Sequence, residues 1–148
     1  MFAELVVAWI LMMNARTPCE TSEQCETYIR PYVEFVFEDH PVTTAEAAVQ
    51  VAWCESRWKP WARNRHSTAT GLFQYLYGTW HAEAHYWGWD ELSDPSHRFD
   101  PVLMTNLTYK VVERDNGWRS GSVSLNCWPR LCFWCKLLLN IVYPKGLF

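Results

Sequence analysis

One carboxylate in the sequence is placed where it could act as an acid. Glu55 lies near the C-terminal end of a predicted helix and on its apolar side, roughly 160° around the helix axis from Arg57. Burial disfavours a charged carboxylate, and the negative end of the helix dipole acts in the same direction. Both effects raise the pKa of Glu55, which would keep the carboxyl protonated as a general acid. The alternative is a structural glutamate that is hydrogen-bonded to nearby backbone or paired with an arginine.

The helix that carries this carboxylate has a predicted start and end. Thr43 and Glu46 form an S/T-x-x-E capping box, which predicts that the helix begins there. Pro60 ends the pattern, because proline cannot continue a helix comfortably. The solvent face carries Glu46, Gln50 and Arg57. The apolar positions recur with helical spacing and are Ala45, Ala48, Val49, Ala52 and Trp53.

A second constellation suggests a metal. His81 and His85 stand at i and i+4, a spacing that can chelate zinc on a helix. Together with residues 132–135, the segment 81–83 also imitates the H-x-E…P-C-x-x-C pattern of zinc deaminases. The imitation fails in detail, because Pro129 lies two residues too early. We therefore predict no metal site and no cofactor.

The composition favours a single globular domain with a carbohydrate ligand. The chain has 148 residues, of which 49% are hydrophobic, and its 13 basic and 16 acidic residues give a net charge of −3. That length is enough to bury a sizeable core. An acidic chain is a poor binder of phosphate backbones, so we expect no nucleic-acid partner. The 10 Trp, 7 Tyr and 7 Phe favour a polymer that stacks on rings, such as a polysaccharide. We expect a monomer.

The patterned sequence lies in the middle of the chain. Residues 1–39 are predicted to form an N-terminal segment with a leading helix near 24–38. Residues 40–128 hold the motifs and are predicted to form the domain. Residues 129–148 form a hydrophobic tail of unknown role.

Both ends of the chain carry apolar stretches. Residues 5–13 have the length of a signal-peptide core, but Glu4 stands where a positive charge is expected. A degenerate export signal and a core helix are both open interpretations. Residues 131–143 are interrupted by Lys136 and Asn140, which disfavours a spanning helix. A packed helix or contact with a membrane surface is open for this tail.

The number of cysteines favours an oxidising compartment. A short chain with an even number of cysteines is typical of a disulfide-bonded protein. Free buried thiols are the alternative. The sequence leaves the connectivity open among Cys19, Cys25, Cys54, Cys127, Cys132 and Cys135.

Several motifs occur in a specific order. The stretch Ala-Trp-Cys-Glu-Ser-Arg-Trp-Lys-Pro at 52–60 is followed by Ala-Arg-Asn at 62–64 and Thr-Gly-Leu-Phe-Gln at 70–74. Asp-Pro at 100–101 and Gly-Trp at 117–118 come later. This series resembles the soluble lytic transglycosylase family of the lysozyme-like superfamily, in which a Glu-Ser pair ends a helix and a Gly-Leu-Met/Phe-Gln stretch follows. The resemblance extends over about residues 43–128.

The resemblance implies a fold and an activity. The fold would be a mainly α-helical, lysozyme-like domain with short strands near Gly71–Tyr75, beside the active-site cleft. The activity would be cleavage of the β-1,4 bond between N-acetylmuramic acid and N-acetylglucosamine in peptidoglycan. Glu55 would act first as acid and then as base, while the muramic acid C6 hydroxyl attacks the anomeric carbon and gives a 1,6-anhydro product. The enzyme would work outside the cell, in the cell wall, or after phage release at lysis.

Two other functions are compatible with the same motifs. A hydrolytic lysozyme would need a second carboxylate near the cleft, and the candidates are Asp90, Glu91, Asp94 and Asp100. A glycan-binding or virion structural protein would use the fold without catalysis, although the intact Glu55 argues against a dead site.

The resemblance also implies substrate-binding residues. Ser56 would be a partner of Glu55 or a structural cap, two polar side chains would contact the glycan, and four aromatic rings would contact the sugars. The fourth of these rings, the cleft tyrosine of the family, falls nearest Tyr109 or Val111. Core packing is the alternative for each ring. Met104 departs from the family pattern, which often has asparagine there. The implied substrate-binding residues are Ser56, Asn64, Phe73, Gln74, Tyr75, Trp80 and Tyr109.

Small secreted members of that family have a disulfide at corresponding positions. The resemblance therefore implies a bond between Cys54 and Cys127, which would tie the helix of Glu55 to the segment after Gly-Trp 117–118.

Overall fold

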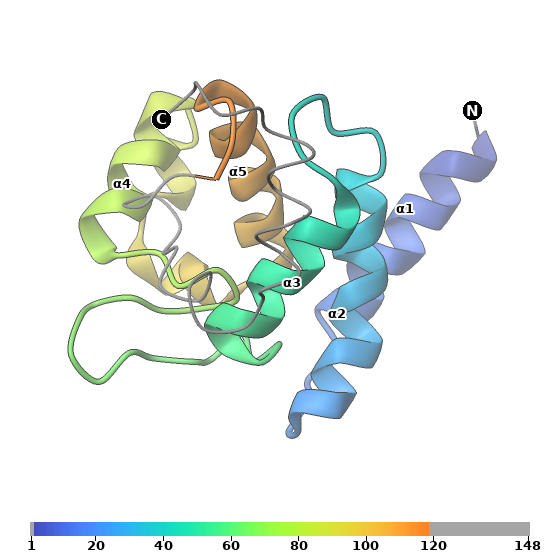
Figure 1. Ribbon diagram of the computed structural model, residues 1–148, viewed down its shortest axis with the longest axis horizontal. Helices are drawn as coiled ribbons and strands as arrows, with labels where there is room; N and C mark the ends of the chain where they lie inside the picture. The colour runs from blue at the N-terminus through green and yellow to red at the C-terminus, as the bar shows by residue number, and fades with distance from the viewer. Residues whose placement is uncertain (1, 119–148) are drawn as a thin grey trace, which may run out of the picture.

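The computed structural model describes residues 2–118, and its regular secondary structure in that range is helical (Figure 1). The predicted mainly α class is confirmed. Pairing of extended backbone within residues 2–118 is limited to two isolated bridges, Arg63 with Thr70 and Thr70 with Tyr75, as expected near Gly71–Tyr75. The α-helices are α1 Phe2–Ala15, α2 Ser22–Phe37, α3 Ala45–Ser56, α4 Tyr77–Tyr86 and α5 Pro101–Arg114. Two short 3₁₀ helices, η1 Asp90–Leu92 and η2 Pro95–Phe99, join α4 to α5.

Helices α2 and α3 lie side by side, with α1 on the outer side of α2 and α5 behind (Figure 1). Helix α5 contacts α1, α2 and α4. The segment between α3 and α4 also contributes large side chains to the core. The largest fully buried side chains include Phe37 of α2, Trp80 of α4, and Trp58, Phe73 and Tyr75 of that connecting segment.

The leading helix predicted near 24–38 is confirmed as α2. Thr21 precedes it with extended backbone, and its hydroxyl accepts a hydrogen bond from the Gln24 N–H at 3.2 Å. One side of α2 is buried against the rest of the domain, through Cys25, Ile29, Tyr32, Val33 and Phe37.

The predicted start of α3 is wrong by one residue. Thr44, not Thr43, is the N-cap, with φ −106° and ψ 155°, and its hydroxyl accepts from the Ala47 N–H at 3.1 Å. Thr43 has another role, because its hydroxyl accepts from the Trp118 ring N–H at 2.7 Å. The Glu46 carboxylate accepts from the side chain of Gln50. The apolar side is buried as predicted, at Ala48, Val49 and Ala52, while Ala45 and Trp53 are half-buried.

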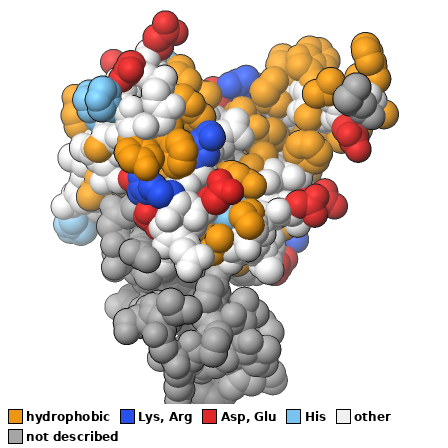
Figure 2. Space-filling model, turned by 90° about the horizontal axis from the view of Figure 1, so that it is seen from above, with side chains coloured by type: hydrophobic (Ala, Val, Ile, Leu, Met, Phe, Trp, Pro, Cys, Tyr) orange, Lys and Arg blue, Asp and Glu red, His pale blue; other side chains and the backbone are white. Residues whose placement is uncertain are grey.

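The N-terminal apolar stretch forms α1, which packs on the domain along one side only. Ala15, with Leu11 and Met12, packs on Tyr32 and Val102. The remaining large apolar side chains are exposed and gather on one projecting part of the surface (Figure 2). They are Phe2, Leu5, Val6, Val7, Trp9, Ile10 and Met13. No helix in the range 2–118 is both long enough and apolar enough to cross a membrane.

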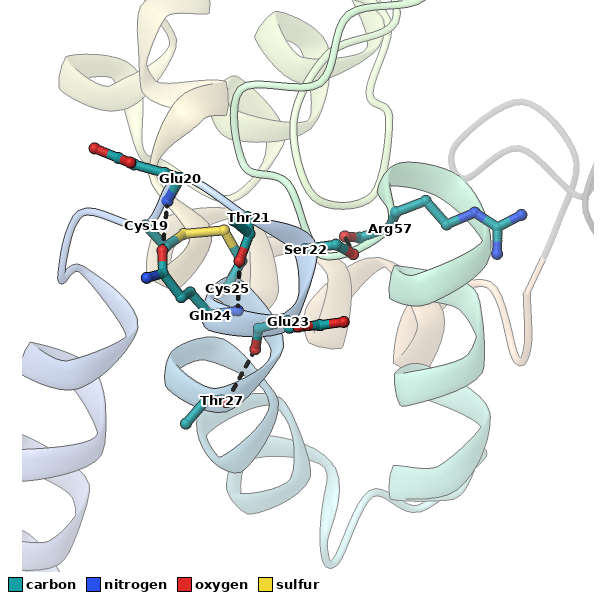
Figure 3. The surroundings of a disulfide bond; sticks show 9 residues. All are labelled: Cys19, Glu20, Thr21, Ser22, Glu23, Gln24, Cys25, Thr27 and Arg57. Carbon is teal, nitrogen blue, oxygen red and sulfur yellow. Dashed lines mark hydrogen bonds between the residues drawn. A yellow bond between two sulfur atoms is a disulfide. The ribbon is translucent and has the colours of Figure 1, made fainter.

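One disulfide joins Cys19 to Cys25, with an S–S distance of 2.07 Å, and spans the first turn of α2 (Figure 3). Cys54 is not a free thiol. Its predicted partner Cys127 lies outside the described residues, so that pairing stays a prediction. The tail at 129–148, with two further cysteines, also lies outside them.

Candidate functional site at the end of helix α3

Glu55 lies in the last turn of α3 and is half-buried. Its Oε1 atom is buried and has no hydrogen-bond partner among residues 2–118. Burial raises the pKa of Glu55 from 4.5 to about 7. The predicted rise is therefore confirmed, and its cause is desolvation.

The alternative for Glu55 was a structural carboxylate that is hydrogen-bonded to backbone or paired with an arginine. The described part of the chain does not support this alternative. Arg57, the arginine nearest in sequence, is exposed and places its guanidinium over the Trp53 ring, 3.5 Å from the centroid. Since this guanidinium lies over the Trp53 ring and Glu55 Oε1 has no hydrogen-bond partner among residues 2–118, Arg57 is not paired with that oxygen. A half-buried carboxyl with a pKa near neutrality can both give and take a proton at physiological pH.

A left-handed turn follows Glu55 and sets where α3 ends. Arg57 has φ 54° and ψ 40°, and Trp58 has φ 66°. Left-handed backbone costs roughly 1–2 kcal/mol per non-glycine residue, so two in succession need support from their surroundings. Trp58 is fully buried, and Lys59 N–H donates to the Ser56 carbonyl at 3.1 Å. The helix thus ends at Ser56, earlier than the predicted stop at Pro60.

Ser56 has a structural role. It is 4% exposed, and its hydroxyl donates to the Ala52 carbonyl at 3.0 Å, one turn earlier in α3. This bond lies within α3, whose C-cap residue is Arg57, so the two roles implied for Ser56 stay predictions.

The side-chain amide of Gln74 joins two parts of the loop after α3. Its amide nitrogen donates to the carbonyls of Ala62 at 3.1 Å and Gly71 at 2.9 Å, and the side chain is buried. Gly71 N–H donates to the same Ala62 carbonyl at 2.9 Å. Both amide hydrogens of Gln74 are therefore used within the loop, and its glycan contact stays a prediction.

Asn64 lies at the outer part of the same loop and is exposed. Its side-chain oxygen accepts from the His66 N–H at 2.8 Å. Its contact with a glycan stays a prediction.

Three of the four predicted ring contacts are wrong. Phe73, Tyr75 and Trp80 have no exposed surface and therefore offer no face to a sugar. The Tyr75 hydroxyl bonds with Thr108 at 3.2 Å, and burial raises the pKa of Tyr75. The Trp80 ring N–H donates to a carbonyl at 3.0 Å. These rings form the core under the loop, which was the alternative for each.

Tyr109 is the fourth ring and is half-buried on α5. It packs against His40 at 4.3 Å and Phe37 at 5.7 Å between ring centroids. Its role as a cleft tyrosine stays a prediction.

Most candidate second carboxylates serve local structure. Asp94 and Asp100 cap η2 and α5 by accepting backbone N–H bonds. Asp90 pairs with His85, and Glu91 is exposed. Among the described residues, the most buried carboxylate is that of Glu83, which is 9% exposed and lies on α4. The sequence pattern did not predict this burial.

Glu83 is neutralised by an arginine of α5. Arg114 donates two hydrogen bonds to its carboxylate, at 2.6 and 2.8 Å. This bidentate pair ties α4 to α5 and leaves Glu83 unsuited to proton transfer.

The two histidines with zinc-like spacing do not gather ligands. His81 and His85 are exposed on α4, and His85 Nδ1 lies 2.5 Å from Asp90 Oδ1. No group of three His, Cys, Asp or Glu side chains suited to a metal occurs in residues 2–118. The cysteines of the deaminase-like pattern lie outside the described residues.

Two residues that support the loop were not predicted to do so. Arg98 is 8% exposed and donates to the Thr68 and Tyr75 carbonyls at 2.6 and 2.9 Å. Met104 accepts a hydrogen bond from the Phe73 N–H, with an N–S distance of 3.1 Å. The sulfur thus bonds to the Gly-Leu-Phe-Gln stretch from the position where the resembled family often has asparagine. No local sequence pattern identifies either contact.

Comparison of the chain with protein-family models, with curated proteins and with solved structures finds no match. The assignment of a chemistry to this site therefore rests on the geometry around Glu55 and on the motif series.

Proposed function

We propose that the protein is a peptidoglycan-cleaving enzyme of the lytic transglycosylase type, with a lysozyme-like fold and Glu55 as its general acid and base. The observation that carries the proposal is the half-buried Glu55 carboxyl, whose Oε1 is unpartnered and whose pKa is raised to about 7. The motif series that begins at this glutamate supports the choice of substrate.

One carboxylate is enough for the proposed reaction. The protonated Glu55 gives its proton to the glycosidic oxygen as the bond to the leaving sugar breaks. The C6 hydroxyl of the same muramic acid then attacks the anomeric carbon, and the Glu55 carboxylate takes up the hydroxyl proton. The attack is intramolecular, so orientation replaces the positioned water that hydrolysis needs.

Two exposed rings that follow α3 in the sequence are the sugar-stacking faces in this proposal. Trp61 is 41% exposed on the loop, six positions after Glu55, and Tyr77 is 53% exposed at the start of α4. They replace the buried Phe73, Tyr75 and Trp80 in that role. The enzyme would act outside the cell or on the cell wall, consistent with the Cys19–Cys25 disulfide.

The test is Glu55→Gln, which keeps the side-chain volume and removes the transferable proton. We expect clearing of a peptidoglycan suspension to slow by about 10²–10⁴-fold, with glycan binding retained. Glu46→Gln is the matched control, because Glu46 lies on the exposed side of the same helix. Near wild-type clearing by Glu55→Gln would remove Glu55 from the mechanism. Loss of clearing only with His81→Ala or His85→Ala would favour a metal site instead.

The reaction products separate the remaining functions. Mass spectrometry of the released muropeptides should find 1,6-anhydro ends. Free reducing ends would indicate the hydrolytic lysozyme, and binding without any released product would indicate a glycan-binding or structural protein.

A further inference from the structure

We propose that Ser22 is a positioning residue for Glu55: its hydroxyl holds the Arg57 carbonyl and so fixes the left-handed turn that ends α3 directly behind the catalytic carboxylate. The predicted effect of Ser22 on catalysis rests on the proposed function. The predicted effect of Ser22 on the geometry of Glu55 does not.

Ser22 is the first residue of α2, and Arg57 follows the last residue of α3. The Ser22 hydroxyl donates a hydrogen bond to the Arg57 carbonyl, across 35 positions of sequence. Figure 3 shows the two residues facing each other between the ends of α2 and α3. Carbonyls at the C-terminal end of a helix have no intrahelical partner, so this bond satisfies a group that would otherwise need water.

The held turn is a strained part of the described chain. Arg57 and Trp58 are adjacent, both have positive φ, and neither is glycine. Such conformations persist only when the surroundings over-determine them. On one side the buried Trp58 ring anchors the turn, and on the other side Ser22 holds its carbonyl. Glu55 lies two positions before Arg57, so a relaxed turn would let the last turn of α3 fray and expose its carboxyl.

Ser22 is itself held in place. The Cys19–Cys25 disulfide spans it, with Cα atoms 5.2 Å apart. Thr21 caps the helix next to it, and the Glu20 N–H donates to the Gln24 side chain at 3.0 Å (Figure 3). The first turn of α2 is therefore a rigid support for the hydroxyl, which is what positioning another element requires.

The experiment compares Ser22→Ala, Ser22→Thr and Thr27→Ala. Ser22→Ala removes the donor, Ser22→Thr restores a hydroxyl, and Thr27→Ala removes a hydroxyl that bonds only within its own helix, to Glu23. We expect Ser22→Ala to lower kcat about 10-fold with KM nearly unchanged, as for a misplaced acid. Ser22→Thr should recover most of the rate, and Thr27→Ala should match wild type.

A second readout requires no catalysis. The titration of the Glu55 carboxyl, followed by carbon-13 NMR, should move to lower pH in Ser22→Ala, because a frayed helix end is better solvated. Ser22→Thr and Thr27→Ala should titrate as wild type. An unchanged titration in Ser22→Ala would overturn the proposal, even if the rate falls. A third outcome is that neither wild type nor any variant cleaves peptidoglycan, while the Glu55 titration in Ser22→Ala moves as expected. The proposed function would then fail, but the positioning of Glu55 by Ser22 would stand.

Arg57→Gly supplies the matching background. Glycine adopts positive φ without strain, so the turn no longer needs to be held. Ser22→Ala should then change the rate less than 3-fold in the Arg57→Gly protein, against about 10-fold in the wild-type background. Equal effects in the two backgrounds would show that Ser22 does not act through this turn.

Discussion

At the scale of single residues, Glu55 combines exposure to solvent with an unpartnered buried oxygen. The wheel position predicted from sequence that Glu55 lies on the apolar side of α3, because helical periodicity decides which side of a helix a residue faces. It did not predict that Oε1 has no hydrogen-bond partner among the described residues. The sugar contacts that the family resemblance implied for Phe73, Tyr75 and Trp80 were wrong, because these rings are buried. An aromatic side chain suits a core and a sugar site equally well, and only tertiary contacts decide between them.

The raised pKa of Glu55 makes stability depend on pH. Between its ordinary value of 4.5 and about 7, the unfolded chain loses the Glu55 proton while the folded protein keeps it. The free energy of unfolding should therefore fall as the pH rises through this window and level off above it. Glu55→Gln removes this contribution, so the variant should gain on the order of 1 kcal/mol relative to wild type between pH 4 and pH 8, since part of the carboxyl remains solvated.

Urea unfolding at several pH values measures this gain. Glu46→Gln is the control, because that carboxylate is exposed on the same helix. A constant difference between Glu55→Gln and wild type across the range would show that the folded protein does not hold the Glu55 proton.

At the scale of elements, helices were easier to predict than the turns that connect them. The apolar spacing predicted α3, but the capping-box pattern chose Thr43, because both threonine side chains can accept an N–H bond. In the structure Thr44 caps the helix, and the Thr43 hydroxyl accepts from the Trp118 ring instead. The loop after α3 was harder still. Its shape depends on Arg98 and Met104, which are distant in sequence.

The close approach of that loop to η2 and α5 can be tested at Gly71. Its φ is +88°, and an added Cβ would lie 2.2 Å from the Arg98 carbonyl oxygen and 2.6 Å from the Met104 methyl carbon. Gly71→Ala should therefore destabilise the fold by at least about 2 kcal/mol in urea unfolding, through strain and overpacking. Gly78→Ala is the control, because no atom lies within 4 Å of its added Cβ and helix α4 favours alanine. Equal stability of the two variants would mean that the loop can leave α5 freely.

At the scale of the whole molecule, two apolar clusters hold the described part together. The larger joins α2, α3, α4, α5 and the loop after α3, and the smaller joins α1 to α2 and α5. An ion pair between Arg16 and Asp100, at 3.0 Å, strengthens the second junction. Sequence alone left a signal core and a packed helix open for α1, because the apolar stretch has the length of a signal core but Glu4 stands where a positive charge is expected. The structure uses one side for packing and leaves the other apolar side exposed.

This division of α1 predicts two different responses to polar substitution. Replacing Leu5, Trp9 and Ile10 together with glutamine should leave the unfolding midpoint in urea unchanged, because these side chains are 66%, 59% and 46% exposed. The same change should lower the binding of an apolar dye, since it removes exposed apolar surface. Leu11→Gln lies on the packed side and should lower the midpoint, because a polar amide would replace an apolar contact with the smaller cluster. A lower midpoint for the triple variant, with Leu11→Gln unaffected, would mean that α1 packs through its opposite side.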